Sequence, residues 1–126
     1  MKNFYITTTL PYVNADPHVG FAMEIIRADV IARAKRLSGY GVFFNTGTDE
    51  HGSKIERNAL ALGIDVKKYV DGNAEKFKKL LPLLGISSDI NFIRTTDKNH
   101  IKSTQALWKT CKERGFIYKK NYKIKY

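Results

Sequence analysis

The feature that most constrains the fold is a short apolar segment followed by a Pro- and Gly-containing loop and a long amphipathic pattern. Residues Phe4–Thr9 (F-Y-I-T-T-T) are β-branched or aromatic, which predicts a buried strand. Residues 11–21 (P-Y-V-N-A-D-P-H-V-G-F) lead into apolar side chains that recur at helical spacing as far as Leu37. A strand, a loop and a helix N-terminus in this order form a typical phosphate-binding unit, because the helix dipole and the first N–H groups face the loop.

Two residues of this loop favour such a site. His18 places an imidazole donor at its mouth, and Gly20 allows a ligand to approach the backbone closely. The alternative is that His18 only forms a hydrogen bond within the loop. Neither a Walker-type phosphate loop nor a G-x-G-x-x-G signature is present, which argues against those two classes of nucleotide-binding protein.

The rest of the chain alternates between strand and helix patterns, which predicts an α/β fold with a parallel sheet of three strands and flanking helices. The predicted strands after the first are 41–45 and 91–94, the predicted helices are 18–37, 53–62, 66–84 and 97–114, and the tail 116–126 has the alternation of an edge strand or hairpin.

A second polar cluster, T-G-T-D-E-H-G at residues 46–52, follows the predicted strand 41–45. Ligands of open parallel sheets bind beyond the carboxyl ends of the strands, so we expect this cluster and the loop 11–21 to share one cleft. Asp49 and Glu50 could bind a substrate ammonium or a ribose hydroxyl. Alternatively, Asp49 caps the next helix, and Glu50 and His51 are solvated loop residues.

Composition limits the other possibilities. The chain has 126 residues, a formal net charge of +10 and a single cysteine, so it is one domain in length and cannot form an internal disulfide. From residue 97 onward nine Lys/Arg stand against two acids, which suits a nucleic-acid contact or a merely solvated helix face. With no apolar signal region or membrane span visible, we expect a cytoplasmic protein with no membrane contact.

The two polar clusters together resemble the N-terminal part of the methionyl-tRNA synthetase family. The similarity runs through T-L-P-Y-V-N-A-D-P-H-V-G-F, G-T-D-E-H-G and L-W-K-T-C-K-E-R-G-F-I-Y-K-K-N-Y, and it covers essentially the whole chain. The resemblance implies the first half of a Rossmann-like class I synthetase nucleotide-binding fold with a C-terminal β extension. It also implies ATP-dependent activation of methionine to methionyl-adenylate and transfer to tRNA(Met), with ATP as a substrate that binds together with Mg²⁺.

Carried over by position, the family's residues fall on the two clusters. The resemblance makes His18 catalytic and ATP-binding, and it implies that Gly20 and Glu24 contact the nucleotide. Methionine would be bound by Leu10, Tyr12 and Asp49.

The chain departs from the family pattern in two respects. The usual His-x-Gly-His signature has Phe21 at its fourth, catalytic position, so Phe21 either stacks on a purine or packs. Residues 1–115 would be the N-terminal half of the catalytic domain and 116–126 the start of the connective zinc-knuckle insertion. No metal is expected in this chain, because the zinc ligands would follow it. We therefore expect an incomplete polypeptide that is inactive alone.

Two rival functions remain. One is another class I synthetase or adenylate-forming nucleotidyltransferase, which the specific pair P-Y-x-N and G-T-D-E-H-G makes less favourable. The other is a noncatalytic RNA-binding module that uses the basic segment from Lys98 to Lys125.

Overall fold

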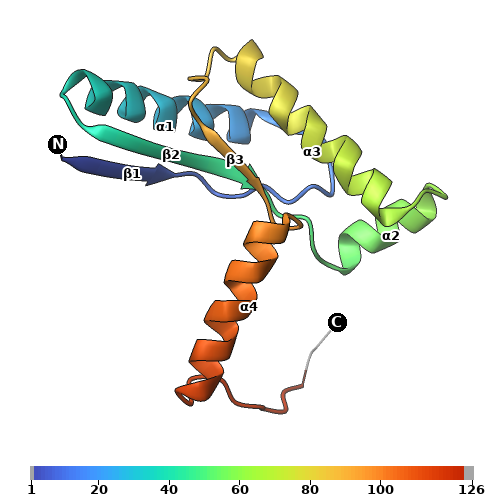
Figure 1. Ribbon diagram of the computed structural model, residues 1–126. Helices are drawn as coiled ribbons and strands as arrows, with labels where there is room; N and C mark the ends of the chain where they lie inside the picture. Colours follow the sequence, from blue (N-terminus) through green and yellow to red (C-terminus); the bar gives the residue numbers. More distant parts are fainter. Residues whose placement is uncertain (1, 124–126) are drawn as a thin grey trace. The chain divides into compact units, whose positions relative to one another are not determined.

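A computed structural model describes residues 2–123, and it confirms the predicted α/β class with a three-stranded parallel sheet. Within this range residues 2–96 form one compact unit and residues 97–123 belong to a second, and the two are described separately below. The elements in chain order are β1 (Asn3–Thr7), α1 (Val19–Leu37), β2 (Gly41–Thr48), α2 (Ser53–Ala61), α3 (Val66–Leu83), β3 (Asn91–Arg94) and α4 (Lys98–Glu113) (Figure 1).

The sheet has the order β1-β2-β3, and the central strand β2 pairs with its two neighbours along different parts of its length. Its first half pairs with β1, from Asn3 opposite Gly41 to Thr7 opposite Asn45. Its second half, from Asn45 to Thr48, pairs with β3. The predicted strand 41–45 is therefore too short: Gly47 interrupts the strand pattern of the polar T-G-T segment, which is extended with β3 beside it.

Gly47 permits that second pairing. A Cβ atom built at this position would lie 1.9 Å from the carbonyl oxygen of Ile93, which no side chain can tolerate. A glycine inside a strand commonly marks such a close approach of two backbones. The carboxyl end of β2, where the second polar cluster begins, is thus held against β3 by a residue that has no side chain.

The core of residues 2–96 lies between the sheet and the helices α1 and α3, which are both above the strands in Figure 1. Its buried apolar side chains come from the sheet, the loop after β1 and the helices α1, α2 and α3: Val13, Phe21, Ile25, Ala28, Ala32, Phe44, Ile55, Val70, Phe77 and Leu81. The opposite face of the sheet carries a stacked pair, Tyr5 and Phe43, which are 61% and 51% exposed. Side chains of β1 and β2 therefore alternate between two faces of the sheet. One face packs against the helices, and the other carries exposed aromatic side chains.

The second unit consists, in its described part, of α4 and an irregular segment. Helix α4 begins after Asp97 and ends near Gly115, as predicted, and buries none of its side chains. The predicted C-terminal β extension is wrong for residues 116–123, which form no strand, and residues 124–126 lie outside the described part. Alternating apolar and lysine residues make a strand only when a hydrogen-bonding neighbour is present, and these residues have no paired strand beside them.

No helix among residues 2–123 has the length and apolar character that crossing a membrane requires.

Gly47 and Gly72 make a matched test of this packing. Gly47→Ala should lower the free energy of unfolding by about 1–3 kcal/mol or more, because the methyl group collides with backbone that cannot move aside. Gly72→Ala should instead raise it by up to about 1 kcal/mol, since Gly72 lies inside α3 and a Cβ there meets nothing within 4 Å. Urea denaturation measures both changes, and equal effects of the two substitutions would contradict the close approach at Gly47.

Candidate functional site

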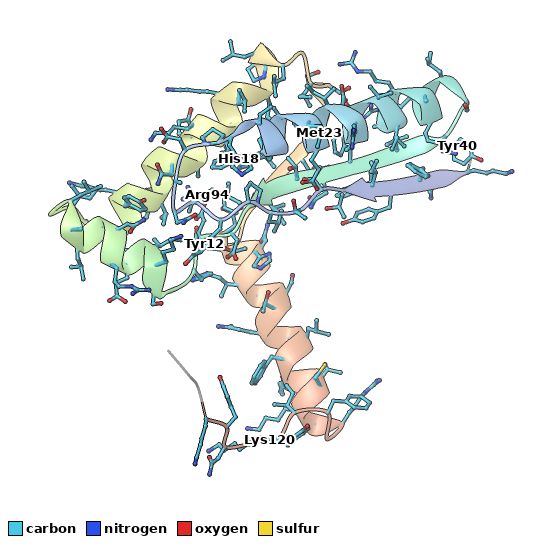
Figure 2. All side chains as sticks on the ribbon, turned by 180° about the vertical axis from the view of Figure 1, so that it is seen from behind. Tyr12, His18, Met23, Tyr40, Arg94 and Lys120 are labelled. Atoms are coloured by element: carbon cyan, nitrogen blue, oxygen red, sulfur yellow. The ribbon has the colours of Figure 1, made fainter. Side chains whose placement is uncertain are left out.

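A cavity of about 300 Å³ lies where the loop after β1 enters α1. Its lining comes from this loop, the first turns of α1 and one residue of α3: Thr9, Pro11, Tyr12, Asn14, Ala15, Asp16, His18, Gly20, Phe21, Glu24 and Phe77. Five of the predicted site residues are among them, and Figure 2 shows Tyr12 and His18 on the loop between β1 and α1. Leu10 and Asp49 are outside this lining.

His18 is the N-cap of α1. Its Nδ1 atom accepts a hydrogen bond from the Gly20 N–H at 3.0 Å, while its carbonyl oxygen accepts from Phe21 and Ala22. A Cβ at Gly20 would lie 2.7 Å from the His18 ring, so the glycine allows the imidazole to fold back onto the helix. Because Nδ1 is an acceptor, the neutral ring carries its proton on Nε2, and the exposed side chain can offer that N–H to a ligand.

This arrangement changes the expected chemistry of the helix N-terminus. The sequence predicts several unpaired N–H groups there, but those of Gly20 and Phe21 are bonded to His18 itself, and Ala22 makes the ordinary helical bond to the same carbonyl oxygen. An anion at this point would meet the helix dipole and the imidazole rather than a row of free amides. The interpretation of His18 as a loop hydrogen-bonding residue and its interpretation as a ligand donor are therefore compatible, since each uses a different ring nitrogen.

Glu24 connects α1 to the end of the first strand. One of its carboxylate oxygens accepts from the Thr9 N–H at 2.7 Å and the other from the Thr9 hydroxyl at 2.6 Å. A carboxylate at this position fixes the start of the loop relative to the helix. Glu24 thus shapes the wall of the cavity through Thr9.

Phe21 is buried, with 4% of its surface exposed, and its ring packs edge-to-face on Phe77 of α3 with a centroid distance of 5.1 Å. Of the two alternatives, packing is therefore the one that the structure supports. An edge-to-face aromatic pair contributes about 0.5–1.5 kcal/mol beyond its buried area. The ring therefore supplies an apolar contact between α1 and α3 at the wall of the cavity rather than a hydrogen-bond donor.

Side chains of α2 and α3 bond to the loop between β1 and α1. The carbonyl oxygen of Asn14 accepts from the Asn58 amide at 3.0 Å and from the Tyr69 hydroxyl at 2.9 Å. The buried Asn73 donates to the Val13 carbonyl at 2.9 Å. Loop carbonyls that would otherwise be unsatisfied near the core are thereby paired, which fixes the loop in one conformation.

The loop and the second polar cluster are joined directly through their backbones. Tyr12 and Asp49 form a parallel β-bridge, in which the Asp49 N–H donates to Pro11 at 2.9 Å and the Val13 N–H donates to Asp49 at 3.1 Å. Asp49 does not cap α2, because the N-cap of that helix is Gly52 and it has no side-chain cap. The alternative that Asp49 merely caps a helix is therefore wrong.

Comparison with known proteins identifies the family. A family model described as class I tRNA synthetases (M) matches residues 4–126. This chain belongs to the class I methionyl-tRNA synthetase family. The methionine–tRNA ligase of Thermotoga maritima is 52% identical over 120 residues, and that of Mycobacterium bovis is 47% identical over 122 residues. These alignments span 95% and 97% of this chain but only 19% and 23% of the two relatives.

Solved structures agree with this placement. Methionyl-tRNA synthetase of Mycobacterium tuberculosis, solved in complex with methionyl-adenylate, superposes with a TM-score of 0.88 at 45% identity, over 91% of this chain and 22% of that one. A leucyl-tRNA synthetase (LeuRS) of Agrobacterium radiobacter superposes with a TM-score of 0.82 at 25% identity, over 93% of this chain and 15% of that one. The sheet, the helices and the loop described above are therefore a synthetase fold.

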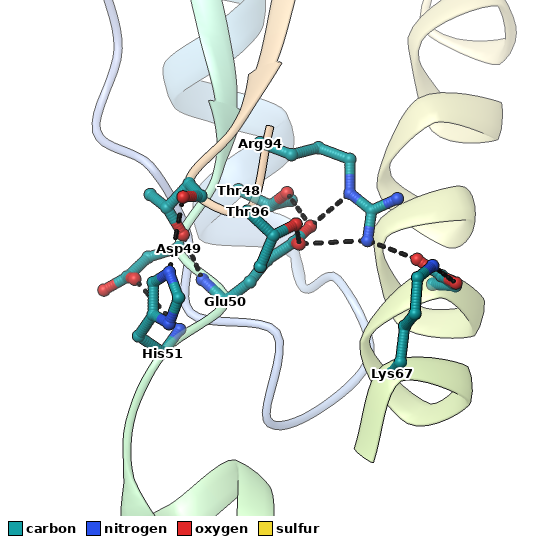
Figure 3. Close-up of polar contacts among 9 residues, drawn as sticks. Thr48, Asp49, Glu50, His51, Lys67, Arg94 and Thr96 are labelled. Atoms are coloured by element: carbon teal, nitrogen blue, oxygen red, sulfur yellow. Dashed lines mark hydrogen bonds and ion pairs between the residues drawn. The ribbon is translucent and has the colours of Figure 1, made fainter. Parts of the chain in front are cut away.

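A hydrogen-bond network around Glu50 is not predicted by the sequence patterns described above. The Glu50 side chain is fully buried and bonds to Thr48, Thr96 and Arg94, so it is not a solvated loop residue (Figure 3). His51 is exposed and lies 3.3 Å from the carbonyl oxygen of Thr95 through its Nε2 atom. The signal that could have found the network is the arginine in N-F-I-R, at the end of the neighbouring strand.

Among residues 2–123 of this synthetase chain, no group of three His, Cys, Asp or Glu side chains is placed to bind a metal ion.

Two substitutions of His18 separate its structural role from its donor role. His18→Ala should cost about 1 kcal/mol of stability, because the α1 cap is lost. His18→Asn should cost only a few tenths of a kcal/mol, since asparagine is a good N-cap residue. Thermal denaturation of both variants checks this, and equal losses would show that the Nδ1 bond contributes nothing as a cap.

Proposed function

We propose that this protein carries out the methionine-activating chemistry of a methionine–tRNA ligase. The observation that carries the proposal is the cavity at the N-terminus of α1, in a chain 45% identical to a synthetase that was solved with methionyl-adenylate. The substrates are methionine and ATP, the latter with Mg²⁺, and the second step transfers the methionyl group to the 3′ end of tRNA(Met) in the cytoplasm. The chain spans about a fifth of its relatives, so the complete reaction is proposed for the full-length protein.

In the activation step a carboxylate oxygen of methionine attacks the α-phosphorus of ATP. The new bond is the acyl–phosphate bond of methionyl-adenylate, the bond from the α-phosphorus to the bridging oxygen breaks, and pyrophosphate leaves with that electron pair. The reaction needs alignment of the two substrates and stabilisation of the charge that builds on phosphate oxygens, with no protein nucleophile.

We assign the phosphate side to the first turn of α1. The Nε2–H of His18 donates to a phosphate oxygen, while its Nδ1 remains bonded to Gly20. The cap bond holds the ring before the substrate arrives, so little conformational freedom is lost in the transition state. Gly20 leaves room for the nucleotide, and Glu24 contributes by holding Thr9 at the edge of the cavity. Phe21 contributes packing in place of a second donor.

The methionine side is assigned to the loop and the second cluster. Leu10 and Tyr12 contact the apolar side chain, and the Asp49 carboxylate binds the ammonium group. Support comes from the backbone bridge between Tyr12 and Asp49, which keeps these two residues at a fixed separation. An anionic group paired with the ammonium also leaves the methionine carboxylate free to attack.

The proposal is tested by methionine-dependent exchange of pyrophosphate into ATP, measured with the full-length protein. Methionine should support exchange, whereas leucine, isoleucine, valine and cysteine should not. His18→Asn should lower kcat by about 10²–10³-fold, because the Nε2–H donor is removed and the shorter asparagine side chain, while its oxygen caps α1, holds its amide N–H closer to the helix.

Thermal denaturation of the same His18→Asn preparation is the control, since unchanged stability assigns the loss to chemistry. Exchange that is specific for another amino acid, or unaffected by His18→Asn, would refute the proposal. Salt-sensitive RNA binding without any exchange would favour the RNA-binding alternative.

A further inference from the structure

The residue next to Asp49 is a buried carboxylate at the end of β2. The Glu50 side chain has no exposed surface, and its oxygens accept from the Thr48 hydroxyl at 2.8 Å and from the Thr96 hydroxyl. Arg94 of β3 donates to both carboxylate oxygens, through Nε at 2.6 Å and Nη2 at 2.9 Å. A buried carboxylate is tolerated only with such compensation, so the position of Glu50 is dictated by the planar guanidinium.

Arg94 also connects this strand end to α3. Its Nη2 atom lies 2.6 Å from an Asp71 carboxylate oxygen, and the other Asp71 oxygen accepts from Lys67 at 2.6 Å (Figure 3). Hydrogen bonds from Lys67 and Arg94 hold the pKa of Asp71 below its usual value, and the bonds to Glu50 raise the pKa of Arg94 above its usual range. Asp71 and Arg94 therefore both remain charged at neutral pH.

The same helix contacts the loop that carries His18. Asn73, two residues after Asp71, donates to the Val13 carbonyl, and Val13 is the residue whose N–H bonds to Asp49. Helix α3 is thus bonded to both halves of the site. One connection runs through Arg94 and Glu50 to the second cluster, and the other runs through Asn73 to the loop.

The side chain of Asp49 points away from this network, on the opposite side of the backbone at the end of β2. Figure 3 shows its carboxylate directed away from Arg94, while the adjacent Glu50 carboxylate is directed toward it. Adjacent residues of extended backbone point to opposite sides, so fixing one side chain fixes the direction of the other. The Glu50 N–H, which donates to the Thr95 hydroxyl at 2.8 Å, restrains the same peptide further.

We propose that Arg94 is a positioning residue for methionine: by holding Glu50, it sets the backbone of residues 48–50 and thereby the place of Asp49 against Tyr12. This inference rests on the proposed function for its choice of ligand. The phosphate side has further contacts of its own that do not involve Arg94, namely the His18 cap and the Glu24–Thr9 bonds. Loss of the Arg94 fork should therefore weaken methionine binding selectively.

Arg94→Lys is the informative variant. Lysine keeps a positive charge near Glu50, so the buried carboxylate is not left uncompensated, but it lacks the planar fork that bonds both oxygens of Glu50 and reaches Asp71. Pyrophosphate exchange by the full-length protein should show a KM for methionine raised about tenfold or more, with the KM for ATP changed by less than about twofold. Equal changes in both KM values, or no change in either, would overturn the proposal.

Asp29→Asn is the matched control for stability. Asp29 is also a buried carboxylate paired with an arginine, Arg33, at 2.7 Å. Burial raises the pKa of Asp29, but hydrogen bonds from Ser87 and Arg33 outweigh that effect and hold the pKa below its usual value. Asp29→Asn should lower the melting temperature and leave both KM values unchanged.

Amide hydrogen exchange provides a readout that does not depend on activity. The N–H groups of Asp49 and Val13, which form the bridge to the loop, should exchange at least about tenfold faster in Arg94→Lys than in Asp29→Asn of similar stability. Unchanged protection of these two amides would refute the positioning role even if the enzyme were inactive. Conversely, faster exchange in a protein that lacks methionine-dependent activity would support the role of Arg94 in positioning Asp49 and would reject methionine as the ligand.

Discussion

The arrangement of the site depends on a carboxylate that has been removed from water. Glu50 is fully buried, and an uncompensated charge there would cost several kcal/mol. The groups that bond to this carboxylate come from β2, from β3 and from the residues just after β3. Arg94 bonds to both carboxylate oxygens and also pairs with Asp71 of α3. The requirement to pair one charge therefore brings three elements to the carboxyl end of the sheet, which is where the second polar cluster lies.

At the start of α1, a single residue again makes several hydrogen bonds. His18 satisfies three of the helix's N-terminal amides by itself, two with its carbonyl oxygen and one with Nδ1. An N-cap residue is ordinarily Ser, Thr, Asp or Asn. A hydroxyl or amide cap also keeps a donor, but on a shorter side chain, whereas imidazole carries its second nitrogen on the far side of the ring from the capping atom. Histidine at this position combines a rigid cap with an N–H that remains available, which explains why a single residue can serve both the fold and a phosphate group.

Much of the fold was predictable from the sequence, because its elements have strong local signals. The helical spacing from residue 18 to Leu37, the strand signal at Phe4–Thr9 and the cap at Asp65 all correspond to observed elements within a few residues. The failures have one cause. The extension of β2 through Gly47 and the absence of a strand in residues 116–123 both depend on whether a neighbouring strand is present, and local sequence does not contain that information.

The sequence by itself determined the class of protein and the residue types that the site uses: an α/β chain of the methionyl-tRNA synthetase family with its imidazole, glycine and carboxylate at the ends of strands. Only the tertiary structure decided what each of these residues does. It made Phe21 a packing residue, Glu50 a buried anchor and Arg94 its partner from a strand 44 positions away in the chain. The physical reason is that burial and charge pairing are properties of contacts between distant segments, whereas helix and strand signals are properties of neighbouring residues.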